Sequence, residues 1–483
     1  MGVGRRALWL GLSQVVELGL QLILPVVLVR HLDTAAFGNY RFLWLLTSAA
    51  ASLLPMGMLD VLAVVLPRAK GQERGAYVAV TYLYMGGIGL LSAILVASGL
   101  SLFASDPMLH RLVPVSAVFT ALWVVGVMMD YLPVADERGD WQARAAIGIA
   151  LLRSLLAAGA AILYGQVEPV FWMLAVAAGG RVLLLLWYAA RHHRLGRILP
   201  SAAHWRHQTG LALPYGLSSL LFSVRRQADQ WIAAFLFGTT QLAMFSLGAV
   251  FGPLVLMVRR VVSSTLMPTM TKMEASGDWH AVIDTNNRAN LAVAFFAAPG
   301  LAFLWCFGEP LYTLVYTSAY LDAVPVMRVL TITWVLQIVE LNSLVMLAGQ
   351  MPYTARISLP LLLASAALSF AGGHFFGLSG AAAGGVLIAF LERSLIVRRL
   401  GQTLAIPVRQ LQAWGSLLAL LAVTWTLAAA GRLAYEWRPA AVPPILGLLA
   451  VALLLAPPYL LIAWRAGWLP HKQMDIPKTK ENA

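Results

Sequence analysis

Polar side chains recur at helical spacing inside the apolar stretch at residues 8–29. Gln14, Glu17 and Gln21 are separated by three and then four residues, so they lie on one face of a helix. The two amides can hydrogen-bond a polar ligand. The carboxylate of Glu17 can bind a proton or a sodium ion. This face therefore predicts a polar surface inside an otherwise apolar helix.

A second polar face is predicted in the stretch at residues 210–236. Ser218, Arg225 and Asp229 fall close to one line at about 100° per residue, and Arg226 lies beside it. A guanidinium can bind two phosphate oxygens at once, so the arginines favour an anionic ligand. Asp229 is a second candidate for ion coupling. The alternative is that either arginine pairs with Asp229 along the same helix.

Other ionisable residues lie inside apolar stretches, where a charge is costly and therefore has a partner or a function. Arg153 and Arg181 are further candidates for binding the anionic ligand, although both could instead join helices together. Glu340 and Asp60 are further candidates for ion coupling. For Asp130, which lies near the end of its apolar stretch, a structural role is favoured.

The elements that position these residues are predicted to be membrane-spanning helices. Hydrophobic residues make up 60% of the 483 residues, charged residues only 11%, and the mean hydropathy is +0.77. Soluble chains contain about 25% charged residues. The net charge of +13 is spread over short loops, which excludes a nucleic-acid-binding face. An all-α polytopic membrane protein follows, with about fourteen stretches of spanning length: 8–29, 41–64, 77–103, 113–131, 143–164, 169–190, 210–236, 240–262, 290–314, 324–348, 356–373, 378–396, 411–430 and 443–464.

Lysine and arginine residues are strongly biased to one side of these spans. Basic residues are enriched in cytoplasmic loops, so the bias predicts that both termini are cytoplasmic. Loops 67–76, 191–209 and 397–410 are then cytoplasmic as well.

The sequence contains an internal repeat at a separation of about 210 residues. Its best segment aligns VPVSAVFTALWV at 113–124 with VPVMRVLTITWV at 324–335. An even number of helices per copy gives both copies the same orientation, which is a parallel repeat. The prediction is two six-helix bundles, at 1–200 and 201–405, related by a pseudo-two-fold axis along the membrane normal. Two further helices and a cytoplasmic tail occupy 406–483.

Three segments carry a resemblance to a known family. They are SQVVELGLQLILPVVLVRHLDTAAFGNY, LPYGLSSLLFSVRRQADQWIAAFLFGTTQLAMFSLG and FGEPLYTLVYTSAYLDAVPVMRVL, and the Phe37-Gly38-x-Tyr40 element and Asp229 are the best local marks. The chain resembles lipid-linked oligosaccharide flippases of the multidrug/oligosaccharidyl-lipid/polysaccharide exporter superfamily. The resemblance implies alternating access of two bundles in the bacterial inner membrane. The implied substrate is a polyprenyl-diphosphate-linked glycan. A polysaccharide polymerase, export machinery and membrane lipids are implied as partners, and no nucleic acid is.

The sequence argues against an enzyme and against a cofactor. It contains no GxxxxGK[ST] loop for nucleotide phosphates and no soluble segment long enough for a catalytic domain. No spacing of metal ligands is present. Two alternatives to a flippase remain: a small-molecule or drug antiporter of the same superfamily, and a membrane-embedded glycan polymerase or ligase. Arginines inside the spans favour an anionic substrate over a cationic drug.

Overall fold

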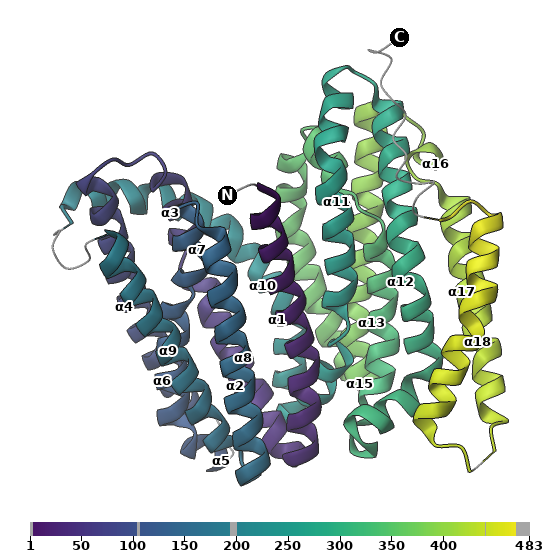
Figure 1. Ribbon diagram of the computed structural model, residues 1–483, viewed down its shortest axis with the longest axis horizontal. Helices are drawn as coiled ribbons and strands as arrows, with labels where there is room; N and C mark the ends of the chain where they lie inside the picture. Colours follow the sequence, from purple (N-terminus) through teal and green to yellow (C-terminus); the bar gives the residue numbers. More distant parts are fainter. Residues whose placement is uncertain (1–2, 104–106, 194–199, 440, 470–483) are drawn as a thin grey trace. The chain divides into compact units, whose positions relative to one another are not determined.

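The computed structural model describes residues 3–103, 107–193, 200–439 and 441–469, without the side chains of 3–8, 102–103, 215, 217–219, 221–222 and 226. The described residues form helices and no strand (Figure 1). By their internal contacts they divide into unit 1, residues 1–243, and unit 2, residues 244–483. The two-bundle repeat, with its boundaries at 200 and 405, stays a prediction.

Unit 1 contains nine complete helices and most of a tenth among its described residues. These are α1 (Val3–His31), α2 (Thr34–Leu53), α3 (Met58–Val65), α4 (Gln72–Phe103), α5 (Pro107–Arg111), α6 (Val113–Gly126), α7 (Met128–Ala135), α8 (Gly139–Tyr164), α9 (Val167–His193) and α10 (Ala202–Gly248). Helix α1 packs along α8, and α6 packs against both α4 and α9. A core of fully buried apolar side chains, including Leu62, Val124 and Leu185, joins α3, α4, α6, α7 and α9.

Unit 2 contains the remaining helices. These are α11 (Gly252–Ala275), α12 (Trp279–Tyr316), the short 3-10 helix η1 (Ser318–Tyr320), α13 (Ala323–Ile338), α14 (Asn342–Leu347), α15 (Met351–Leu404), α16 (Val408–Leu411), α17 (Trp414–Glu436) and α18 (Pro444–Arg465). Helix α12 packs against α11, α13 and α17, and α17 packs against α18. The hydroxyl of Tyr459 on α18 donates to the carbonyl of Phe295 on α12 at 2.7 Å, which fixes the C-terminal helix pair to the unit.

The prediction of an all-helical polytopic membrane protein is confirmed. Among the described residues, ten helices are long and apolar enough to cross a membrane, or eleven if the bent pair α2 and α3 is one span. The number is below fourteen because α15 contains two predicted spans that meet at a kink at Gly377, where φ is 67°. In addition, α13 has only 16 residues, and the span of α10 is counted together with α11.

The bend between α2 and α3 depends on a close approach of two backbones. The two helices meet at 43°. Met56 and Gly57 have φ of 45° and 76°, in the left-handed region that favours glycine. Gly216 of α10 lies against this bend, and a Cβ on it would lie 2.2 Å from the carbonyl oxygen of Met56. A residue larger than glycine at 216 would therefore displace the bend.

The Phe37-Gly38-x-Tyr40 element also has a packing role. Phe37 is fully buried, and Tyr40 is 4% exposed. A Cβ on Gly38 would lie 2.7 Å from the carbonyl oxygen of Thr239, so this glycine allows α2 to approach α10.

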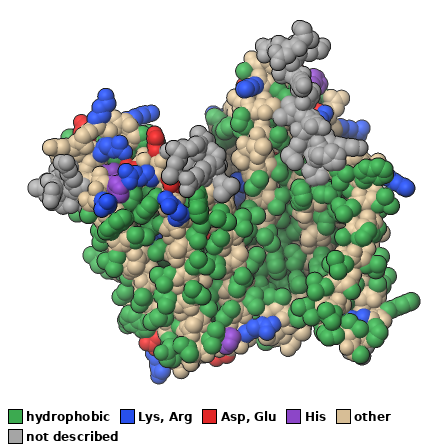
Figure 2. All heavy atoms as spheres, viewed as in Figure 1, with side chains coloured by type: hydrophobic (Ala, Val, Ile, Leu, Met, Phe, Trp, Pro, Cys, Tyr) green, Lys and Arg blue, Asp and Glu red, His purple; other side chains and the backbone are tan. Residues whose placement is uncertain are grey.

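The surface of each unit agrees with a membrane environment. On the face seen in Figure 2, hydrophobic side chains cover the middle of the helices, while the Lys, Arg, Asp, Glu and His side chains gather toward the helix ends. Exposed leucines such as Leu90, Leu155 and Leu453 lie within the spans. Such an apolar surface is stable in lipid and not in water.

Candidate functional site

Two arginines of unit 1 lie on the faces of two tryptophans inside the helix bundle. The guanidinium carbon of Arg153 on α8 is 5.6 Å from the ring centroid of Trp44 on α2 and 5.3 Å from that of Trp123 on α6. The guanidinium carbon of Arg181 on α9 is 5.2 Å from the same Trp123 ring. These distances are those of cation–π contacts. We call these four residues the arginine cage.

The two arginines of the cage differ in their partners. Arg181 donates to the carboxylate of Asp130 on α7 at 2.6 Å. Arg153 is 8% exposed, and its Nε is buried without a hydrogen-bond acceptor. Within the described residues Arg153 forms no ion pair. Buried charges are normally paired and hydrogen-bonded, so Arg153 has donors available to a ligand.

The polar face predicted on α1 lies at the surface of the protein and not in its core. Gln14, Glu17 and Gln21 are all exposed, and α1 packs along α8, which carries Arg153. Glu17 is among the groups that interact electrostatically with Arg153. Glu17 is thus the residue of the first predicted face that is linked electrostatically to the arginine cage.

The second predicted face, on α10, is described only in part. The side chains of Ser218 and Arg226 lie outside the described residues. Arg225 and Asp229 are half-buried, and neither is without a partner. Their roles in headgroup binding and ion coupling stay predictions.

Glu340 occupies a break between two helices of unit 2. Its carboxylate accepts from Nε of Arg259 at 3.0 Å and from the backbone N–H of Asn342 at 2.8 Å, which caps α14. Its own N–H donates to Asn290, and its carbonyl accepts from Asn286. With its side chain 8% exposed, Glu340 has the partners of a structural carboxylate.

The same network continues to other elements of unit 2. Asn290 donates to the side chain of Gln412, before α17, at 2.7 Å. Arg393 on α15 donates to the carbonyl of Val339 at 2.6 Å. The unwound segment 339–341 is thus tied to α11, α12, α15 and the start of the C-terminal helix pair.

Asp60 lies in the first turn of α3, directly after the bend. It is half-buried, and the positive end of the helix dipole favours a carboxylate there. This geometry neither adds to nor removes its predicted role in ion coupling. Among the described residues, no group of three His, Cys, Asp or Glu side chains is placed to hold a metal ion.

Asp136 directly follows α7, outside the candidate spans, and organises a cluster with residues near the ends of α4 and α9. Its carboxylate accepts from Arg74 at 2.8 Å, from the hydroxyl of Tyr188 at 2.9 Å and from Nε2 of His193 at 2.6 Å. Burial alone would raise the pKa of Asp136. The hydrogen bonds from His193, Tyr188 and Arg74 outweigh burial and hold the pKa below its usual range.

Replacing Asp136 with asparagine is expected to lower the free energy of unfolding by about 1–3 kcal/mol at neutral pH, because charged hydrogen bonds are lost. A carboxyl whose pKa is lower in the folded state stabilises the fold above the unfolded pKa of about 3.9. The difference between wild type and variant should therefore shrink as the pH falls below about 3.9 and through the lower pKa of the folded state. Thermal unfolding in detergent across pH measures it. Asp140→Asn, which removes the exposed pair with Arg144, should change little at any pH.

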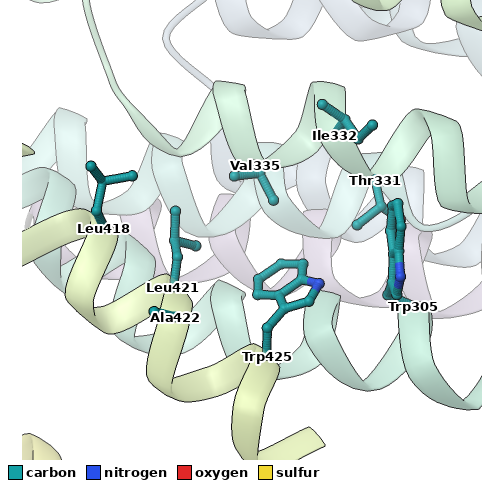
Figure 3. A pocket seen from close by; sticks show the side chains of 8 residues that line it. All are labelled: Trp305, Thr331, Ile332, Val335, Leu418, Leu421, Ala422 and Trp425. Carbon is teal, nitrogen blue, oxygen red and sulfur yellow. The ribbon is translucent and has the colours of Figure 1, made fainter. Parts of the chain in front are cut away.

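An apolar groove is formed by three helices of unit 2. It has a volume of about 430 Å³ and is lined by side chains of α12, α13 and α17 (Figure 3): Trp305, Thr331, Ile332, Val335, Leu418, Leu421, Ala422 and Trp425. Thr331 is the one residue in this lining with a polar group beyond the indoles, and its hydroxyl donates to the carbonyl of Met327. The groove therefore suits a hydrocarbon chain and not a polar ligand.

Comparison with known proteins places the chain in a family. Residues 3–274, more than half of the chain, match the model of a family described as "Polysaccharide biosynthesis protein". The chain belongs to this family. No curated protein matches the sequence significantly.

Solved structures of transporters share the fold of this family member. The lipid II flippase MurJ, in an inward closed conformation, matches with a TM-score of 0.70 at 12% identity, over 95% of this chain and 98% of that chain. An inward-facing multidrug resistance MATE transporter of the MOP superfamily matches with a TM-score of 0.57 at 15% identity, over 81% and 95%. The Vibrio cholerae MATE transporter VcmN matches at 0.55 and 14%, over 83% and 95%.

These matches confirm the resemblance predicted from the sequence. The chain shares the fold of these flippase and transporter structures, and it is a multi-span membrane protein. The prediction that it is not an enzyme agrees with its family and with the structures that share its fold. At identities of 12–15% the structural matches establish the fold and not the substrate.

Sequence reasoning missed three parts of the site. It did not include Trp44 and Trp123 among the site residues, although the arginines lie against their rings. It gave Asp130 only a structural role, without its partner Arg181. A signal was present for Trp123 and Asp130, because both lie in the span that contains the repeat's best segment, but not for Trp44.

Proposed function

We propose that this protein is a flippase that moves polyprenyl-diphosphate-linked oligosaccharide repeat units across the bacterial inner membrane. Alternating access of two bundles provides the movement, and both termini lie in the cytoplasm. The family description and the shared flippase fold support a role in polysaccharide biosynthesis. The observation that carries the proposal is Arg153, a buried guanidinium with an Nε that has no acceptor.

A diphosphate provides the hydrogen-bond acceptors that Arg153 lacks. Its oxygens accept charge-assisted hydrogen bonds, and these are roughly twice as strong as neutral ones. The guanidinium is held against two indole rings, so little side-chain freedom is lost when an anion binds. Arg225, Arg226, Arg181, Gln14, Gln21 and Ser218 remain the further candidates for contact with the headgroup. Glu17, Asp229, Glu340 and Asp60 remain the candidates for ion coupling.

The apolar groove of unit 2 supports the lipid part of the substrate. A polyprenyl chain has no polar group beyond its diphosphate end, and the groove offers almost no polar contact. Both substrate chemistries, anionic and hydrocarbon, are thus matched by side chains at membrane depth.

The drug antiporter is the second candidate, because MATE transporters share the fold. The arginine cage disfavours it, since a buried cationic cluster repels a cationic drug. No comparable observation favours the polymerase or ligase.

Transport by the purified protein in proteoliposomes distinguishes these functions. We expect it to translocate a fluorescent glycan on polyprenyl diphosphate. It should not translocate the same glycan on an uncharged polyprenol, because the anion is needed at Arg153. Movement of a cationic dye, with none of the diphosphate lipid, would contradict the proposal. Liposomes without protein and liposomes with a heat-denatured sample serve as controls.

A further inference from the structure

We propose that Asp130 is an internal counter-ion that competes with the anionic ligand for Arg181 and thereby sets how readily the ligand is released. This inference rests on the proposed function, because it regulates the same anion site. It concerns a residue to which sequence reasoning gave no functional role.

The arginine cage brings two positive charges close together. Arg153 and Arg181 both lie within 5.3 Å of the centre of the Trp123 ring, so the two guanidinium groups cannot be far apart. Asp130 supplies one negative charge to two positive ones. Glu17 interacts with Arg153 electrostatically, but no hydrogen bond or ion pair joins the two residues in the described structure. The Nε of Arg153 therefore still has a hydrogen to donate to an anion.

Asp130 is more accessible than the arginine with which it pairs. Its side chain is 46% exposed, whereas that of Arg181 is 9% exposed. The carboxylate can therefore move away and be solvated, while the guanidinium remains in place on Trp123. Among the described residues, Arg181 is the one side chain that donates a hydrogen bond to this carboxylate. A single partner and an exposed carboxylate make the pair exchangeable.

Unit 2 contains a similarly placed carboxylate with different partners. Asp130 follows Trp123 by seven residues, and Glu340 follows Trp334, the residue that the predicted repeat aligns with Trp123, by six. Asp130 lies in the first turn of α7, just after the break that follows α6, and Glu340 lies within the break between α13 and α14. Glu340 is 8% exposed and is held by Arg259 and by the start of α14. Of the two similarly placed acids, only Asp130 is free to exchange its partner.

The consequence is a displacement mechanism for binding and release. A phosphate oxygen that enters the cage accepts a hydrogen bond from Arg153. It also replaces the carboxylate of Asp130 as the acceptor for Arg181. When Asp130 returns to Arg181, the ligand loses one of its two cations and leaves. A transporter must bind its substrate on one side and release it on the other, so binding that is too tight would slow turnover.

Asp130→Asn tests the mechanism, because the amide keeps the shape of the side chain and removes its charge. We expect the variant to bind inorganic pyrophosphate and a short-chain isoprenyl diphosphate roughly tenfold more tightly than wild type, the gain from losing one competing charged hydrogen bond. Quenching of tryptophan fluorescence and calorimetry measure the affinity. Export of the lipid-linked glycan should fall. Asp140→Asn, which alters an exposed pair on α8, should change neither quantity.

Each outcome decides one of the two proposals. Equal or weaker anion binding by a folded Asp130→Asn protein overturns the counter-ion mechanism. If Arg153→Met abolishes binding at the same time, the proposed function still stands. If pyrophosphate binding rises in Asp130→Asn but no diphosphate lipid binds, the mechanism stands for a free anion and the proposed function fails. If no phosphate probe binds to either protein, both proposals fail.

Discussion

Replacing Glu340 with alanine is expected to lower the free energy of unfolding by about 3–5 kcal/mol, the usual penalty for removing one partner of a buried ion pair. Arg259 would keep only the carbonyl of Gln337, at 3.2 Å, as an acceptor. The cap of α14 would be lost as well. Thermal unfolding in detergent, followed by circular dichroism, measures the change.

A matched control lies on α12 of the same unit. Asp284→Ala removes a pair with Arg288 at 2.8 Å, but the side chain of Asp284 is 55% exposed. Exposed pairs of this kind contribute less than about 1 kcal/mol. Equal losses in the two variants would show that the segment 339–341 does not depend on the Glu340 carboxylate.

The helices of this protein could be predicted from the sequence for a physical reason. A backbone in lipid must pair its own N–H and C=O groups, and a helix pairs them within a single segment. Long apolar stretches are therefore expected to be helices. The same reasoning could not predict where spans join or break. Gly377 allows two spans to be joined by a sharp kink, and Val339, with ψ of 109°, ends α13 early. Such positions depend on tertiary packing, which periodicity does not contain.

The candidate site was predictable only to the level of single residues. Arg153 and Arg181 stood out because a charge inside a span is costly. The sequence could not show that both stack on Trp123, since the rotation of α6 about its axis is set by its packing on α4 and α9. For Glu340 the sequence could not show that Arg259, on a different helix, reaches its carboxylate. Long-range pairing of this kind requires the fold.

Replacing Arg153 with methionine is expected to reduce glycan export by at least about 10-fold, because one or more charged hydrogen bonds to the headgroup are lost. The stability of the protein should move in the opposite direction. Arg153 is 8% exposed and has no ion pair within the described residues. An apolar side chain of similar length in its place is therefore expected to leave the free energy of unfolding unchanged or to raise it, by up to about 4 kcal/mol.

Opposite changes in export and in stability would distinguish a substrate-binding role of Arg153 from a structural role. Arg144→Met on the same helix removes an arginine that is 54% exposed, and it should alter neither export nor stability appreciably. Arg153→Lys keeps the charge but loses the planar fork, so it should retain part of the export if charge dominates and little if two-point binding dominates. Export at matched protein levels and thermal unfolding are measured on each variant.

Parallel losses of export and stability in Arg153→Met would make Arg153 a structural residue. Normal export in a folded protein would place the headgroup site elsewhere, with Arg225 and Arg226 as the next pair to test. A residue that costs stability and is needed for transport is what a substrate site inside a membrane span predicts.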